Sequence, residues 1–262
     1  LNYKIIFTLK GQHPLTILFK DSKKTKMNSN KKTARIAGFL FLILIISGVF
    51  AEYFIRQKII VSGNPGATVQ NIINSEWLFR LGIVSDLFMS AAFFFFSLVL
   101  YHLFKTVSKY YASAMVLCVT ISCSILCINM LNQIAPLVIL SGADYLSNFQ
   151  TEQLHGLVTF FLKMHTNGYY IAQLFFGLYL FPLGLLVYKS GFLPKIIGVF
   201  LMMGCFGDLI DLFRFFLFPD FESVILNNIT LPADIGEFSF CLWLLIKGVK
   251  EVKPISKEVA GV

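Results

Sequence analysis

Six long apolar runs divide this chain, and they decide what it can fold into. They are residues 34–55, 77–104, 111–140, 168–188, 194–218 and 231–249. A transmembrane helix needs about 20 predominantly apolar residues, so each run is long enough to cross a bilayer. The runs are continuous rather than alternating, which excludes the strands of a membrane β-barrel. We therefore expect an all-α polytopic membrane protein, a bundle of six transmembrane helices.

The composition agrees with a membrane protein and excludes several other classes. Of 262 residues, 56% are hydrophobic and only 14% are charged, against about 25% charged residues in an ordinary soluble domain. Six spans with short connections leave no room for a soluble catalytic domain. A basic patch that binds nucleic acid needs a soluble face, so we expect the bilayer, and no nucleic acid, as the partner of this chain.

The basic residues predict the orientation of the bundle. The N-terminal segment and the connections after spans two, four and six hold 17 of the 22 Lys and Arg residues but only 3 of the 14 acidic ones. Short cytoplasmic loops carry such an excess of Lys and Arg. Both termini should therefore face the cytoplasm, where the basic residues contact anionic lipid headgroups.

The chain divides into three parts by this pattern. We expect residues 1–30 to form a basic cytoplasmic extension without regular structure, 31–250 the six-span domain, and 251–262 a cytoplasmic tail. Met27 and the Asn-Ser-Asn-Lys-Lys that follows it are typical of the start of a bacterial inner-membrane protein, so residues 1–26 are interpreted as an upstream extension. An alternative interpretation makes the first run a signal peptide, but it is longer than the 7–15 apolar residues of a usual signal.

Two connections on the outer side predict short amphipathic helices at the membrane interface. After the turn at Asn64, apolar residues recur at i, i+3 and i+4, in Val69, Ile72 and Ile73. A second short helix is expected to open at Thr151, ahead of span four. This spacing places the apolar residues of each segment on one helical face, which suits an interfacial helix.

The familiar catalytic motifs are missing from the sequence. It has no H-E-x-x-H, no G-x-S-x-G and no Walker-type glycine loop, which excludes the easily recognised metalloproteases, serine hydrolases and nucleotide-driven pumps. All five cysteines fall inside predicted spans, where free Cys serves as a small apolar packing residue. We expect no cofactor and name no catalytic residue.

The informative residues are the ionisable and amide groups inside the spans, because each is expensive there and usually faces a partner or a water-filled cavity. Counted along the helices, these groups share the outer half of the bilayer. The acids are Glu52, Asp86, Asp208, Asp211, Asp234 and Glu237, the amides Asn129 and Gln133, and the balancing cations Arg80 and Arg214. Six acids against two arginines leave a negative surplus that cannot stay ionised and unpaired in hydrocarbon. We therefore expect an acid-rich vestibule that opens outward.

Three functions remain open for such a vestibule. The first is a non-enzymatic permease for a small solute, cation or proton, or a sensor of such a ligand, in which Asp86 and Asp211 bind or relay the ion. The second is an intramembrane metal-dependent hydrolase in which the carboxylates and His165 bind the metal. The third is a structural or assembly protein whose polar residues join helices.

Several segments of the sequence also resemble a known family. They are residues 34–38, 52–56, 75–80 with Asp86, His165 with Gly168 and Tyr169, 190–194, and Gly236 and Glu237 with 243–248. The chain resembles, over about residues 31–250, a bacterial integral-membrane family described as domain of unknown function 4386. The resemblance implies a multi-span inner-membrane protein with an acid at Asp211, and it carries no activity, cofactor or catalytic residue.

Overall fold

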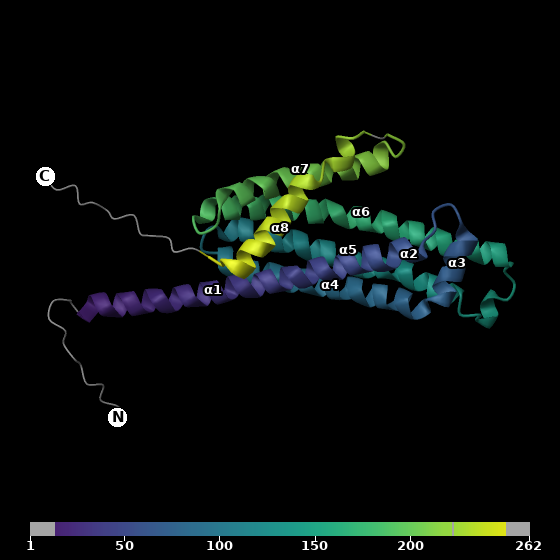
Figure 1. The fold of residues 1–262 in the computed structure, drawn as a ribbon, viewed down its shortest axis with the longest axis horizontal. Coiled ribbons are helices and arrows are strands. Elements are labelled where there is room, and N and C mark those ends of the chain that lie inside the picture. The colour runs from purple at the N-terminus through teal and green to yellow at the C-terminus, as the bar shows by residue number, and fades with distance from the viewer. Residues whose placement is uncertain (1–13, 222, 250–262) are drawn as a thin grey trace, which may run out of the picture.

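The computed structural model describes residues 14–221 and 223–249, and the part of the chain that it describes is helical without strands. Its long helices are α1 (Pro14–Val49), α4 (Glu76–Phe104), α5 (Lys109–Ile139), α6 (Thr151–Ser190), α7 (Lys195–Leu217) and α8 (Leu231–Ile246). Between them lie the π-helix η1 (Phe50–Arg56), the short α2 (Gln57–Ile59) and α3 (Pro65–Asn74), and the 3-10 turns η2 (Asp144–Leu146) and η3 (Leu226–Asn228). Figure 1 shows that the helices form one elongated bundle.

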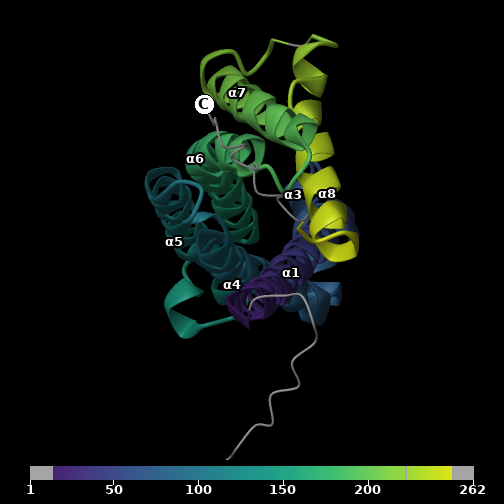
Figure 2. The same ribbon diagram turned by 90° about the vertical axis from the view of Figure 1, so that its left-hand side faces the viewer.

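The long helices form a closed ring in chain order. Helices α1 and α4, α4 and α5, α5 and α6, α6 and α7, and α7 and α8 pack as neighbours, and α8 also packs on α1. The view along the bundle in Figure 2 shows α8 between α7 and α1. The segment that follows α8 lies beside the first helix, since Gly248 is next to Lys31 of α1.

Within the described residues, five helices are long and apolar enough to cross a membrane: Asn30–Ile59, which runs through α1, η1 and α2, together with α4, α5, α6 and α7. Helix α8 has the apolar composition of the expected sixth span but only 16 residues. At 1.5 Å per residue it is about 24 Å long, shorter than the roughly 30 Å hydrocarbon core.

Two expectations differ from the structure. The separate interfacial helix at Thr151 is wrong, because α6 is one helix of 40 residues from Thr151 to Ser190; no residue between Thr151 and the apolar run breaks the helix, and Gln150 and Gln153 cap its start reciprocally. Helix α1 begins at Pro14, inside the segment expected to lack regular structure. Residues 1–13 and the expected tail 251–262 lie outside the described residues.

The expected short helix after the first span is present as α3. Asn64 caps it by accepting a hydrogen bond from the Ala67 amide at 3.0 Å, as an N-cap residue does. Its buried residues are Thr68, Val69 and Ile72. They cover one end of the bundle.

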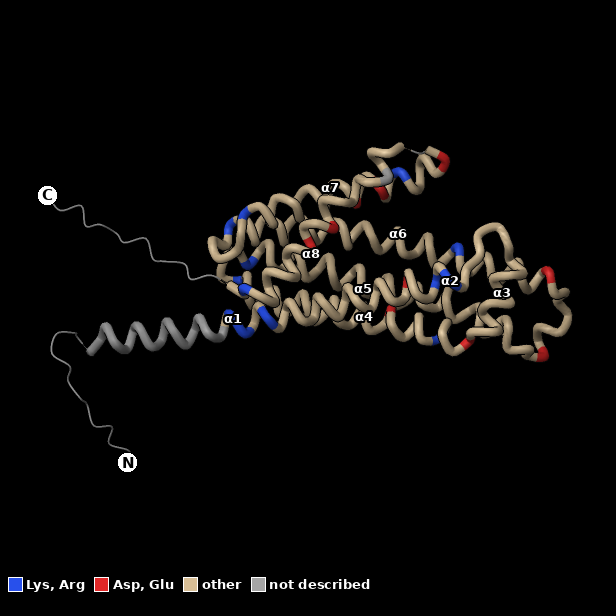
Figure 3. The backbone as a smooth tube through the Cα atoms, in the orientation of Figure 1, with Lys and Arg blue, Asp and Glu red and all other residues tan. Residues whose placement is uncertain are grey.

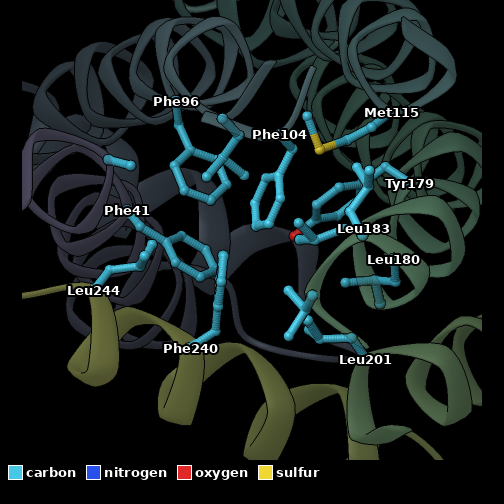
Figure 4. Packing of buried hydrophobic residues seen from close by; sticks show 14 of the residues in the cluster. Phe41, Phe96, Phe104, Met115, Tyr179, Leu180, Leu183, Leu201, Phe240 and Leu244 are labelled. Carbon is cyan, nitrogen blue, oxygen red and sulfur yellow. The ribbon is translucent and has the colours of Figure 1, made fainter. Parts of the chain in front are cut away.

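The bundle has two hydrophobic clusters, one near each end. The larger cluster joins all six long helices through residues such as Phe41, Phe96, Tyr179 and Phe240, and the close-up in Figure 4 shows these side chains meeting in the middle of the ring. The Phe41 and Phe96 rings stack with centroids 4.5 Å apart. The smaller cluster lies under α3.

The smaller cluster is built from η1, α2, α3, α4, α5 and α6, and its members are Ile55, Ile59, Val69, Ile72, Phe79, Ile83, Ile139, Val158 and Leu162. Along α4 this cluster ends at Ile83 and the larger one begins at Ala92. Between these two positions, α4 contributes no buried residue to either cluster.

Small residues let α7 approach α8 closely. A Cβ on Gly204 would lie 2.6 Å from the Ala233 Cα, and a Cβ on Gly236 would lie 3.0 Å from the Leu201 amide nitrogen. Membrane helices associate through such close packing because lipid supplies no hydrophobic drive between them. This contact fixes α8, and with it Asp234 and Glu237, against the rest of the ring.

Candidate functional site

A cavity of about 770 Å³ occupies the layer between the two hydrophobic clusters. Helices α1, η1, α4, α5, α6 and α8 all contribute to its wall. The lining residues are Gly48, Val49, Glu52, Tyr53, Arg56, Gln57, Ile60, Asp86, Met89, Ser90, Leu126, Met130, His165, Thr166, Tyr169, Tyr170 and Asp234. Polar and ionisable side chains therefore meet inside the bundle, with apolar packing above and below them.

One wall of the cavity is the π-helix η1. Each π-helical hydrogen bond joins residue i to i+5, a rare geometry that is frequently found at functional sites. Seven residues, Phe50–Arg56, adopt it here. The widened turn presents both Glu52 and Arg56 to the cavity.

Arg56 joins two acids of the cavity. Its Nη1 lies 2.5 Å from Asp86 Oδ2, and its Nε lies 2.7 Å from Glu52 Oε2. The Asp86 side chain is only 4% exposed and that of Arg56 is 15% exposed, whereas Glu52 is 47% exposed. Asp86 is thus the buried acid of this group and Glu52 is the accessible one.

His165 lies on the opposite wall and is held by α5. The Asn129 side chain donates to the His165 carbonyl at 2.8 Å, and Gln133 Nε2 lies 3.1 Å from His165 Nε2. Asn132 donates in turn to the Asn129 side chain at 3.0 Å. Asn129 and Gln133 are buried and do not line the cavity. Their hydrogen bonds to His165 join α5 to α6.

A second polar group lies on α6, α7 and α8. Arg214 Nη2 donates to Asp211 Oδ1 at 2.8 Å, and Gln173 Nε2 lies 3.4 Å from Asp211 Oδ2. The buried Tyr179 donates its hydroxyl hydrogen to Glu237 Oε1. These contacts place acids of α7 and α8 beside the apolar interior.

Asp208 is the most isolated acid of this group. It is 5% exposed, and its Oδ2 has no hydrogen-bond partner in the part of the chain that the structure describes. Asp211, Asp234 and Glu237 all lie close enough to interact with it electrostatically. The group therefore concentrates acidic side chains.

Tyr169 connects the two polar groups. It lines the cavity and lies within electrostatic range of Arg56 and Glu52 on one side and of Asp208 and Glu237 on the other. Asp234, on α8, also belongs to both the cavity lining and the surroundings of Asp208. The two groups consequently form one acid-rich region.

The structure separates the residues that the sequence singled out into four sets. Glu52, Asp86, Asp234 and His165 line the cavity; Asp208, Asp211, Glu237 and Arg214 form the second group; Asn129 and Gln133 join α5 to α6; and Arg80 pairs with Glu76. Both side chains of this last pair are 53% exposed. Arg80 thus lies on the surface of the bundle, away from the acids that it was expected to balance.

The cation that contacts Asp86 is Arg56, which the sequence reasoning missed. Arg56 follows directly on the apolar run 34–55, so hydropathy alone places it outside the first span, but η1 continues the helix through it. The spacing of Glu52 and Arg56, at i and i+4, was the signal that could have found it, because residues so spaced are neighbours on a helix. Tyr169, Tyr170 and Tyr179 carried no comparable signal.

The arrangement offers little to a metal. Among residues 14–221 and 223–249, no three His, Cys, Asp or Glu side chains converge as ligands of one ion. His165 meets the Gln133 amide, and the cavity acids meet Arg56. The geometry thus gives the hydrolase hypothesis no metal centre in this region.

The chain is similar in sequence to other proteins. An uncharacterized protein of Archaeoglobus fulgidus is 35% identical over 105 residues, which cover 40% of this chain and 57% of that relative. No solved structure matches the chain. Residues 36–248 match the family described as domain of unknown function (DUF4386). This match runs from α1 to the end of α8 and includes both polar groups, and the chain belongs to that family.

Proposed function

We propose that the protein binds a small cationic solute in the cavity between the two hydrophobic clusters, as a permease or as a sensor. The observation that carries this proposal is the charge of the lining. Three acids, Glu52, Asp86 and Asp234, line the cavity with one cation, Arg56, so two carboxyl groups are left without a balancing cation. A cation offsets that surplus, whereas an anion increases it.

The position of these acids within the helical bundle also supports a ligand that enters the membrane. Acids inside membrane spans mark ion and substrate pathways because their desolvation is costly without a partner. Here the acids lie between apolar clusters of the bundle and beside a cavity of about 770 Å³. Such a volume has room for a solute together with several waters.

We further propose six crossings of a bacterial inner membrane, with both termini in the cytoplasm. Figure 3 supports this topology, since Lys and Arg gather at the end of the bundle where α1 enters it, while most acids lie toward the other end. Helix α8 would be the sixth span, extended by the residues up to Val249. In this orientation the cavity opens toward the outside, and α3 lies at the outer interface.

The test is transport and binding by the purified full-length chain in liposomes. We expect uptake or binding of K⁺, Na⁺ or methylammonium, reduced about tenfold or more in Asp86→Asn and in Glu52→Gln, because each removes one carboxylate from the cavity. Asp144→Asn is the matched control, since Asp144 is an exposed acid in η2. Binding with flux identifies a permease, and binding without flux identifies a sensor.

Two results would overturn this proposal. One is equal binding and flux in Asp86→Asn, Glu52→Gln and the control. The other is a wild-type protein that prefers an anion such as chloride or acetate over all three cations. Glu52→Gln protects the test against misfolding, because Glu52 is half exposed and Arg56 keeps its contact with Asp86 in that variant.

A further inference from the structure

A second cavity continues the first one toward the larger hydrophobic cluster. It has a volume of about 230 Å³ and lies among α1, α4, α5 and α6. The residues that line both cavities are Gly48, Val49, Met89, Ser90, Leu126 and Tyr169. Because six residues line both cavities, the two cavities adjoin and together form one binding region with two ends.

The two ends differ in chemistry. The outer end carries Glu52, Asp86 and Asp234. The inner end is lined by apolar side chains such as Leu44, Phe93 and Phe176, and it contains no carboxylate, Lys or Arg. A ligand that fills both ends must therefore have a charged part and a hydrocarbon part.

The rings of the outer end favour an organic cation over a bare metal ion. Tyr53, Tyr169 and Tyr170 line it together with the acids. Aromatic faces attract alkylammonium groups, as in the aromatic cages that bind choline or methyl-lysine. A metal ion needs converging oxygen or nitrogen ligands, and the described residues hold no such set of acids, His and Cys.

The volume of the inner end limits the hydrocarbon part. An apolar cavity of about 150 Å³ holds one benzene molecule, so a cavity of about 230 Å³ holds roughly eight or nine carbon atoms. The two long acyl chains of a phospholipid do not fit in this space. One short chain or one substituted ring does.

From this geometry we infer that the ligand is a single-tailed organic ammonium ion, with its charged head among Glu52, Asp86 and the tyrosines and a tail of about eight carbons or fewer in the inner cavity. The inference rests on the proposed function and narrows it to a substrate class. It explains why polar and apolar cavities adjoin in one bundle.

The test compares head and tail separately in the purified full-length chain. Binding of tetramethylammonium, of butyl-, octyl- and dodecyltrimethylammonium, and of octyl sulfate is measured by calorimetry in nanodiscs. We expect affinity to rise at least tenfold from tetramethylammonium to octyltrimethylammonium and to fall again for the dodecyl compound. Octyl sulfate should bind at least tenfold more weakly than its cationic counterpart.

Variants of the inner cavity then locate the tail. Ile45 lines this cavity, whereas its neighbour Ile46 does not and is 59% exposed. Ile45→Trp should weaken octyltrimethylammonium binding about tenfold and leave tetramethylammonium binding unchanged, while the matched Ile46→Trp should change neither. Phe176→Ala enlarges the cavity and should shift the preferred tail to a longer one, so it tests the same idea if Ile45→Trp fails to fold.

The outcomes separate this inference from the proposed function. If tetramethylammonium binds in an Asp86-dependent manner but longer tails add nothing, or if neither Ile45→Trp nor Phe176→Ala changes the tail preference, the single-tailed ligand is refuted and the cation site stands. If no ammonium ion binds and the inorganic cations do, only this inference falls. If no cation of either kind binds, both fall together.

Discussion

Replacing Arg56 by Gln is the sharpest perturbation of the candidate site, because Arg56 holds two acids with one side chain. The substitution leaves Asp86 4% exposed and without its cation. Removing one partner of a buried ion pair costs about 3–5 kcal/mol, since the other charge stays buried and uncompensated. The contact with Glu52 adds little, as Glu52 is 47% exposed and pairs with such exposure contribute about 0.5 kcal/mol.

We therefore expect Arg56→Gln to lower the free energy of unfolding by about 3 kcal/mol, the lower end of the range because Arg56 itself is partly solvated. The double variant Arg56→Gln/Asp86→Asn should recover to within about 1 kcal/mol of the wild type, since it replaces the ion pair by two neutral amides. Reversible unfolding in mixed detergent micelles, with all variants in one double-mutant cycle, measures both quantities.

Arg80→Gln is the matched control for this cycle. Arg80 also pairs with an acid four residues away, at 2.7 Å, but both side chains are 53% exposed, so its loss should cost less than about 1 kcal/mol. If Arg56→Gln and Arg80→Gln cost the same, or if the double variant is no more stable than Arg56→Gln, the reasoning that Asp86 needs a compensating cation is refuted.

Three further predictions test the packing of the ring. Gly204→Ala should destabilise the protein by about 1–3 kcal/mol because its Cβ would overlap α8, whereas Gly156→Ala, where a Cβ meets nothing within 4 Å, should be neutral or stabilising in the same unfolding assay; equal effects would contradict the close approach of α7 and α8. Phe41→Ala should cost about 3 kcal/mol because Phe41 is 1% exposed, whereas Phe39→Ala, at 58% exposure, should cost less than about 1 kcal/mol. Thermal melting of both variants measures this difference, and a lower melting temperature for Phe39→Ala than for Phe41→Ala would contradict it. Tyr179→Phe should cost about 1 kcal/mol, the value of one hydrogen bond between membrane helices. A carboxyl band of Glu237 that is unchanged by this substitution in infrared difference spectra would argue against the bond between the two side chains.

The sequence was a good guide to the five described helices that are long and apolar enough to cross a membrane. The apolar run 77–104 lies within one residue of α4 (Glu76–Phe104), because hydrocarbon selects length and apolarity, which a sequence records directly. The start of α6 was missed by 17 residues, since the expected span began at 168 and the helix begins at Thr151. Its first turns carry Glu152, His155 and Lys163, and hydropathy alone does not reveal that a helix continues beyond the apolar region.

The acids of the candidate site could be named from the sequence, but neither their contacts nor the role of Arg56 could. The depth of Asp86 follows from its position in its run, but the choice of Arg56 over Arg80 as its partner depends on how α1 packs against α4, across 30 positions of sequence. The roles of Asn129 and Gln133 depended on packing in the same way. Their spacing shows that they share a face of α5, and only the position of α6 shows that this face meets His165.

The closure of the ring by its last helix has a consequence for how the molecule is made. Leu244 and Leu245 of α8 cover Gly38 of α1, yet α8 begins at Leu231, long after the first span ends at Ile59. Ribosomes add about 5–20 residues per second, so α1 waits on the order of 10–30 s with this face turned to lipid or to an insertion factor. The nascent chain therefore passes through an open five-helix intermediate with a lateral seam, and the cavity acquires Asp234 only after α8 has been made.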